Sequence, residues 1–144
     1  MITIIDGYLI ILHRLDMSGV YHLSLAVSDI LVSKKFYKNL LVPLGWEITY
    51  EDDEALGISD GSFSLWIIPA ENPDTKHTFH AVGFHHLAIR VDDRNTVDKA
   101  YKYCQTQGIE VVDAPAEYPE YQDEYYAVFL LDPDGMKLEI VSLD

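Results

Sequence analysis

The chain has 144 residues, the usual size of one domain, and nearly half of them are apolar, which predicts a single globular unit. Its 24 acidic side chains outnumber 10 basic ones and give a formal net charge of −14. A field of that sign repels nucleic acid and acidic membranes, so neither is expected as a partner. A small anionic substrate is still compatible with this charge, because the potential of a cleft depends mainly on the residues that line it.

The first 18 residues match no other part of the chain and are expected to form an N-terminal extension of unknown role. An extra edge strand, a contact with a partner and a misassigned start all remain open for it. Its apolar stretch from Tyr8 to Leu12 is too short to span a bilayer, and it lacks the basic start and cleavage site of a secretory signal. Because Cys104 is the only cysteine and no internal disulfide can form, a cytoplasmic location is expected.

Two segments of the chain are similar to each other and predict a duplicated fold. Residues 22–29 read His-Leu-Ser-Leu-Ala-Val-Ser-Asp, and residues 86–93, 64 positions later, read His-Leu-Ala-Ile-Arg-Val-Asp-Asp. In both, aliphatic residues alternate with polar or small ones, which is typical of a strand that is buried on one face. The histidine that opens each strand is therefore expected to point away from the aliphatic layer.

Each of these strands is followed by the same series of predicted elements. A helix is expected over residues 31–41 and again over 96–107, with Asp29 and Asp93 among the available N-caps. A glycine follows each helix, and a new strand pattern begins after it. Two Asp-Gly dipeptides stand between later strand patterns, as hairpin turns do: Asp60-Gly61 and Asp134-Gly135. The second half has extra residues around 113–125, which we predict to be a loop.

Each half thus reads strand, helix and three strands, which predicts an α+β fold built from two βαβββ modules. We expect a single domain over residues 19–144. Module one covers 19–69, a polar connector covers 70–83, and module two covers 84–143.

These modules resemble the vicinal oxygen chelate superfamily, which contains glyoxalase I, fosfomycin-resistance transferases, extradiol dioxygenases and bleomycin-binding proteins. The resemblance covers residues 19–143. It rests on the two strands that begin with histidine, on Phe36-Tyr37, and on the run Asp132-Pro133-Asp134-Gly135-Met136-Lys137-Leu138-Glu139-Ile140. It implies that the modules form a curved mixed sheet that encloses a metal-binding cavity, with the helices on the outside.

By this resemblance, His22, His86 and Glu139 are the candidate ligands of one divalent metal ion. The strand alternation agrees, because Leu138 and Ile140 can pack beneath the sheet and leave Glu139 on the side of the histidines. Two imidazoles and one carboxylate suit Zn, Ni, Mn, Co or Fe(II) and leave coordination positions open. The alternative is a metal-free binding protein in which these side chains have structural roles.

The family pattern often includes a fourth ligand, from module one. Counting five residues from Asp60, as Glu139 is counted from Asp134, gives Leu65, which cannot bind a metal. This gap disfavours, without excluding, the activity of glyoxalase I itself. An ion with open positions can accept two adjacent substrate oxygens and stabilise negative charge on them. By resemblance to glyoxalase I, Glu139 is also the candidate catalytic proton acceptor.

Three further residues are candidates for substrate binding. Arg90 is expected on the same strand face as His86, where it could hold a carboxylate or phosphate or form a salt bridge. Tyr118 and Tyr126 belong to a tyrosine-rich segment that could line the pocket or simply pack. His85 is expected on the opposite strand face from His86, away from the metal.

The function predicted first is a divalent-metal-dependent, glyoxalase-like lyase or isomerase that acts on a small substrate with adjacent oxygens. An Fe(II) extradiol-type dioxygenase and a fosfomycin-type thiol transferase are the alternative enzymes. A non-catalytic binder of a drug or metabolite, of the bleomycin-resistance type, is the alternative from another class. The resemblance also implies a homodimer, with the site either within one chain or at the dimer interface.

Overall fold

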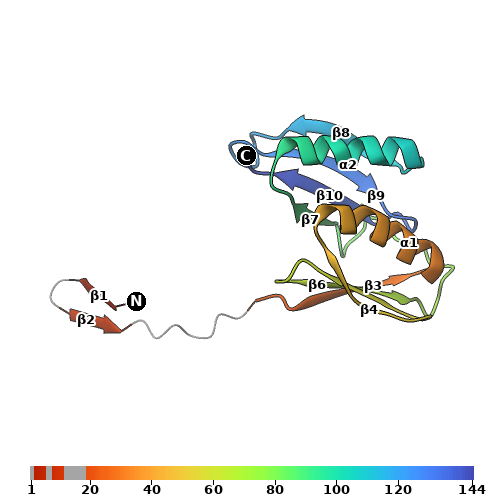
Figure 1. Ribbon diagram of the computed structural model, residues 1–144, viewed down its shortest axis with the longest axis horizontal. Coiled ribbons are helices and arrows are strands. Elements are labelled where there is room, and N and C mark those ends of the chain that lie inside the picture. Colours follow the sequence, from red (N-terminus) through yellow and green to blue (C-terminus); the bar gives the residue numbers. More distant parts are fainter. Residues whose placement is uncertain (1, 6–7, 12–18) are drawn as a thin grey trace.

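The computed structural model describes residues 2–5, 8–11 and 19–144 (Figure 1). In the N-terminal extension, β1 (Ile2–Ile5) pairs antiparallel with β2 (Tyr8–Ile11). Residues 1, 6–7 and 12–18 lie outside the described residues, and the three alternatives for the role of the extension stay open.

The rest of the chain follows the predicted order of elements twice. Module one consists of β3 (His22–Val27), α1 (Ile30–Leu41), the 3-10 turn η1 (Val42–Leu44), β4 (Glu47–Glu51), β5 (Leu56–Ser59) and β6 (Ser64–Pro69). Module two consists of β7 (His86–Arg90), α2 (Arg94–Gln107), β8 (Val111–Glu117), β9 (Tyr126–Leu131) and β10 (Lys137–Ser142). The prediction of an α+β fold made of two βαβββ modules is confirmed.

Each module has its own four-stranded mixed sheet, in the order β3-β6-β5-β4 and β7-β10-β9-β8. In each sheet the first strand runs parallel to the last strand of its module, and the other pairs are antiparallel. Both sheets are open, and the described strands do not close into a barrel. Figure 1 shows α2 lying across the module-two sheet and α1 between the two modules.

Both predicted N-caps form. The side chain of Asp29 accepts hydrogen bonds from the backbone N–H groups of Leu31 and Val32, both at 3.0 Å. The side chain of Asp93 accepts from the backbone N–H of Thr96 at 2.7 Å. These bonds satisfy amide groups that have no partner within the helix, and they fix the point at which each strand turns into its helix.

The Asp-Pro-Asp-Gly turn of module two joins the modules. The hydroxyl of Tyr37, a fully buried residue of α1, donates to Asp132 Oδ2 at 2.8 Å. Asp134 Oδ2 accepts from the backbone N–H of Ser28 at 3.0 Å. Burial raises the pKa of both Tyr37 and Asp132, and the negative charge of Asp132 raises that of Tyr37 further. One continuous core of buried aliphatic residues from both modules lies beside this contact.

The prediction that the extra residues of module two, around 113–125, form a loop is only partly right. β8 extends to Glu117 and pairs with β9, so the irregular segment is confined to residues 118–125. Register shifts along β8 accommodate residues for which module one has no counterpart.

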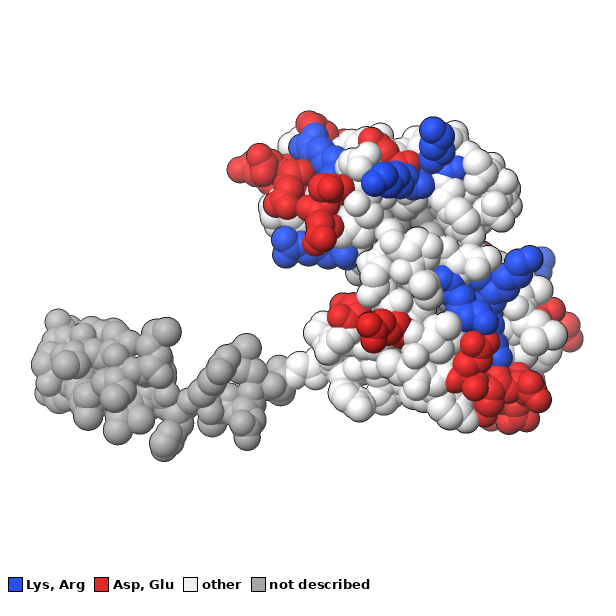
Figure 2. Space-filling model, in the orientation of Figure 1, with Lys and Arg blue, Asp and Glu red and all other residues white. Residues whose placement is uncertain are grey.

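The charged surface is unevenly distributed. Figure 2 shows an acidic group at the end of β4 next to basic side chains, where Glu51 Oε1 lies 2.6 Å from Lys38 Nζ and 3.6 Å from Lys34 Nζ. On this face of the molecule, broad areas without Lys, Arg, Asp or Glu side chains separate the charged groups. In the part of the chain that the structure describes, no helix is long and apolar enough to cross a membrane.

Candidate functional site

The face of the module-two sheet that points away from its helix carries the polar candidates. Strand pairing sets Lys137 opposite His86 and sets Glu139 between Ala88 and Phe129. The intervening residues Leu138 and Ile140 are fully buried in the core. Because successive side chains of a strand point to opposite faces, Lys137 and Glu139 share the open face with His86.

His86 and Glu139 are in contact. His86 Nε2 lies 3.1 Å from Glu139 Oε2, and the Glu139 side chain is only 1% exposed. The other carboxylate oxygen, Oε1, accepts a hydrogen bond of 2.5 Å from the hydroxyl of Tyr125. Burial and this bond raise the pKa of Tyr125, so its phenol keeps the proton that it donates. A buried carboxylate therefore has one partner for each oxygen, and one of these partners is an imidazole.

This pair opens into a cavity of about 290 Å³, the tyrosine pocket, which is lined by His85, His86, Asp113, Tyr118, Tyr121, Tyr125, Phe129, Lys137 and Glu139. The rings of Tyr118 and Tyr121 are stacked, with centroids 5.6 Å apart. Lys137 Nζ lies 4.2 Å from the centroid of Phe129 and 3.9 Å from Asp113 Oδ2. The tyrosine pocket thus combines an imidazole, a carboxylate and a cation with aromatic walls.

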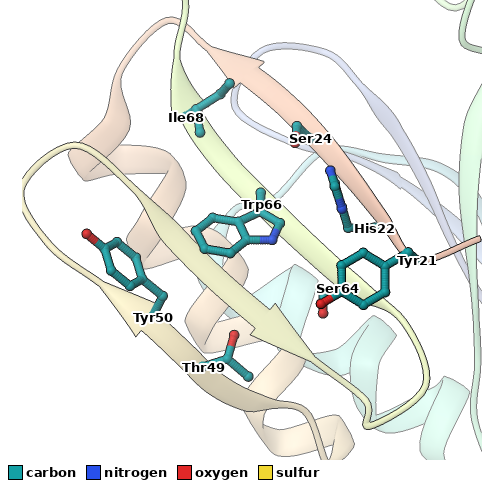
Figure 3. A pocket seen from close by; sticks show the side chains of 8 residues that line it. All are labelled: Tyr21, His22, Ser24, Thr49, Tyr50, Ser64, Trp66 and Ile68. Atoms are coloured by element: carbon teal, nitrogen blue, oxygen red, sulfur yellow. The ribbon is translucent and has the colours of Figure 1, made fainter.

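His22 lies elsewhere in the chain. It is the first residue of β3, in the module-one sheet, and Figure 3 shows it beside Tyr21 on the open face of that sheet. It also borders, together with Arg90, a cavity of about 630 Å³ between the modules. Among the described residues, no three His, Cys, Asp or Glu side chains are close enough to hold one metal ion. One chain thus brings His86 and Glu139 together but not His22, and the three-residue ligand set stays a prediction.

The candidate substrate residues are also separated. Tyr118 lines the tyrosine pocket, whereas Arg90 lines the cavity between the modules. Tyr126 lies on the helix side of the sheet, where its hydroxyl donates to Asp98 Oδ1 at 2.8 Å. The neighbouring Tyr125 is the residue that reaches Glu139, and sequence reasoning missed it. One part of this could have been read from the sequence: Tyr126, the first residue of β9, alternates in phase with the core residues Val128 and Leu130 and therefore points away from the pocket.

Two other residues of the tyrosine pocket were not predicted. His85 was expected on the far face of the strand, but its Nδ1 lies 2.6 Å from Nδ1 of His86. The expectation was wrong because β7 begins only at His86, so strand alternation does not apply to the residue before it. Lys137 was overlooked although it stands two positions before Glu139 on the same strand, and therefore on the same face.

The module-one counterpart of Glu139 is Trp66, not Leu65. Strand pairing sets Trp66 opposite Ser24, as it sets Glu139 opposite Ala88. The turn before β6 is one residue longer than the turn before β10, so counting from the Asp-Gly dipeptide misses by one. Leu65 is fully buried, as an aliphatic residue on the core face should be. The conclusion that module one has no carboxylate at this position is unaffected.

Comparison with known proteins agrees with this architecture. A family model described as the glyoxalase/bleomycin resistance protein/dioxygenase superfamily matches residues 19–140. The uncharacterized protein YqjT of Bacillus subtilis (strain 168) is 29% identical over 124 residues, which are 85% of this chain and 97% of YqjT.

Two solved structures with lower identity share the fold. Lactoylglutathione lyase from Agrobacterium tumefaciens has a TM-score of 0.64 and 22% identity over 88% of this chain and 95% of its own. The fosfomycin resistance protein FosX from Listeria monocytogenes has a TM-score of 0.66 and 18% identity over 88% of this chain and 93% of its own.

Proposed function

Because the chain belongs to the glyoxalase/bleomycin resistance protein/dioxygenase superfamily, we propose that it is a divalent-metal-dependent, glyoxalase-like enzyme, a lyase or isomerase. Its substrate is a small molecule that chelates the metal through two adjacent oxygens. The single observation that carries the proposal is the contact between His86 and the buried Glu139 at the base of the tyrosine pocket. A lactoylglutathione lyase and the fosfomycin resistance protein FosX have the same fold, which is consistent with the proposal.

The residues of the tyrosine pocket fit a divalent metal ion. Glu139 is a buried carboxylate whose nearest basic group is the His86 imidazole, and a buried charge of this kind favours a strong cationic partner. The nitrogen and oxygen donors suit a borderline metal such as Zn, Ni, Mn, Co or Fe(II). Tyr125 would act as the outer residue that orients the ligand carboxylate.

His22 would complete the set from a second copy of the chain. It lies on the open face of the module-one sheet, away from the tyrosine pocket of its own chain. In a two-fold symmetric dimer, the open face of module one in one copy can meet that of module two in its partner, and the same contact then forms twice. We therefore propose a homodimer with its two sites at the interface.

In this site each residue has a separate task. A divalent ion bound by these ligands would supply Lewis-acid stabilisation of negative charge on the two substrate oxygens. Glu139 Oε2 would accept a proton from the substrate carbon next to those oxygens. Lys137, whose side chain is 12% exposed, would hold a negatively charged substrate oxygen. Tyr118 and Phe129 would line the pocket and exclude water from the reacting atoms.

Metal analysis tests the proposal directly. Protein purified without chelators is expected to contain one metal ion per chain, and Glu139→Gln and His86→Ala are expected to lose it. His80→Ala is the matched control, because His80 is an exposed connector histidine that lines no part of the tyrosine pocket. Protein without a stoichiometric ion, or an ion that survives in all three variants, would favour the non-catalytic binder.

Mixing two defective chains tests the interface. Co-expression of His22→Ala with Glu139→Gln gives mixed dimers, in which one of the two sites has all its ligands if His22 comes from the partner. Random pairing in equal amounts should then restore about a quarter of the metal sites. If all three ligands come from a single chain, mixing restores none.

A further inference from the structure

The open face of the module-one sheet carries an indole where module two carries its buried carboxylate. Trp66 on β6 occupies the register position of Glu139, and it has His22 and Ser24 on the neighbouring strand β3. Figure 3 shows Trp66 and Tyr50 on the same face of the sheet, where they come from β6 and β4, the strands on either side of β5. The duplicated fold has therefore placed an aromatic side chain where the other module has its ionisable one.

A missing side chain makes room for this indole. Gly57 on β5 lies between Tyr50 and Trp66 in the strand pairing. A Cβ atom at Gly57 would lie 3.1 Å from Thr49 Oγ1, 3.2 Å from Tyr50 Cβ and 3.3 Å from Trp66 Cη2. These distances are tighter than ordinary carbon contacts, so a side chain at this position would force Thr49, Tyr50 and the indole to shift by a few tenths of an ångström. Gly57 thus leaves room for the edge of the Trp66 ring above β5.

Tyr50 is held beside the indole. Its ring centroid is 5.5 Å from that of Trp66 at an interplanar angle of 39°, and its hydroxyl donates to Asp52 Oδ2 at 2.5 Å. Tyr50 is nevertheless 45% exposed, and Trp66 is only partly buried. Tyr50 and Trp66 over Gly57, which we term the aromatic platform, thus present two fixed rings to solvent.

The cavity above the aromatic platform has about 580 Å³, within the range of small-molecule sites. It is lined by Tyr21, His22, Ser24, Thr49, Tyr50, Ser64, Trp66 and Ile68. In a chain with a net charge of −14, this lining contains no Asp, Glu, Lys or Arg. A charged group placed here would lose hydration without gaining an ion pair to an Asp, Glu, Lys or Arg side chain, whereas a flat neutral ring gains contact with aromatic surface.

We propose that the aromatic platform binds a flat, uncharged aromatic group of the substrate. The inference rests on the proposed function, because the adjacent oxygens of the same molecule would lie at the metal ligands, with His22 bordering both parts. The hydroxyls of Ser24, Thr49 and Ser64 can hydrogen-bond neutral polar substituents at the edge of the ring. The glutathione moiety, with two carboxylates and no ring, fits this lining poorly.

The test uses two probes that share one ring and differ in charge. 4-Nitrobenzyl alcohol is neutral, and 4-nitrobenzoate carries a carboxylate at the same position. Affinities of the native chain and of each variant are measured by isothermal titration calorimetry. The place of binding is followed by the indole N–H signals in ¹H–¹⁵N NMR spectra, of which the native chain has two, one each from Trp46 and Trp66. Trp46→Phe identifies the Trp66 signal and leaves the aromatic platform intact.

The neutral probe is expected to shift the Trp66 signal in a saturable way and to bind at least about tenfold more tightly than the carboxylate. Trp66→Ala should weaken its binding by about tenfold, the effect typical of one stacked ring. Gly57→Ala should weaken it as well, by displacing the same ring. Equal affinity for both probes, unchanged affinity in Trp66→Ala, or a shift of the Trp46 signal alone would overturn the proposal.

One comparison separates this inference from the proposed function. The neutral probe carries no chelating pair, so it should bind equally well to the native chain and to Glu139→Gln, whether or not a metal is present. Catechol carries a ring together with two adjacent hydroxyls, and Zn²⁺ should strengthen its binding to the native chain. If the chain binds Zn²⁺ but the metal does not strengthen catechol binding, the aromatic platform is not part of the substrate site.

Discussion

Removing the Tyr125 hydroxyl tests whether Glu139 is a metal ligand that Tyr125 holds in place. In Tyr125→Phe, Glu139 Oε1 loses its hydrogen bond of 2.5 Å, and the carboxylate keeps only the contact of Oε2 with His86 at 3.1 Å. Glu139 is 1% exposed, so water cannot readily replace the lost donor. A hydrogen bond to a charged group contributes about 1.5–3 kcal/mol, and most of this should be lost from the free energy of unfolding.

Two measurements follow from this geometry. The melting temperature of the metal-free protein should fall by roughly 5 °C, given a domain of this size. The affinity for Zn²⁺, measured by competition with a chromophoric chelator, should fall by about 10- to 100-fold, as it does when a residue that orients a metal ligand is removed.

Tyr126→Phe is the matched control. The neighbouring tyrosine also donates to a carboxylate, Asp98 Oδ1 at 2.8 Å, but on the exposed helix side of the sheet. The Tyr126→Phe variant should therefore bind Zn²⁺ as tightly as the native chain, and its melting temperature should fall by less than that of Tyr125→Phe. If Tyr125→Phe lost stability but bound Zn²⁺ as tightly as the native chain, Glu139 would not be a ligand.

Three other predictions concern residues outside that bond. Tyr37→Phe removes the buried bond to Asp132 and should lower the free energy of unfolding in urea by about 1–3 kcal/mol, whereas a loss below about 0.5 kcal/mol would argue against a role in joining the modules. Burial raises the pKa of Cys104 from 9.0 to about 11, so at mildly alkaline pH the folded protein should hold about a hundredfold less thiolate and react with a thiol reagent only after unfolding. Rapid labelling of the folded protein would contradict this. Lys137→Met should retain Zn²⁺ but bind oxalate about tenfold more weakly, with Lys137→Arg in between, and unchanged oxalate binding would remove Lys137 from the proposed site.

The sequence was sufficient for the fold because the informative patterns are local. Period-two alternation located β3 and β7, and the acidic residues Asp29 and Asp93 located the starts of the helices. Each of these signals depends only on residues that are close together in the sequence, within a single strand or the first turn of a helix. The duplication then doubled the evidence, since each module supported the reading of the other.

The site was less predictable because it depends on register and on distant parts of the chain. The turn before β6 is one residue longer than the turn before β10, so the residue that faces the cavity is Trp66 and not Leu65. No pattern within the turn indicates its length. The separation of His22 from His86 likewise depends on which faces of the two sheets meet. Alternation along a strand says which face a residue occupies, but it does not say which other face lies opposite.

The duplicated positions have diverged in a way that divides the work of a site between the modules. Module two has the buried Glu139 with Tyr125 and Lys137 around it, a set suited to bind a metal and move a proton. Module one has Trp66 at the equivalent position, over a glycine and within an uncharged lining, a set suited to recognise a ring. A charged substrate group suits the first set and a neutral ring suits the second, because a charge that is buried without a partner is costly. Since one chain holds the two faces on separate sheets, the proposed pairing with a second copy would bring the reacting group and the recognising group to the same substrate.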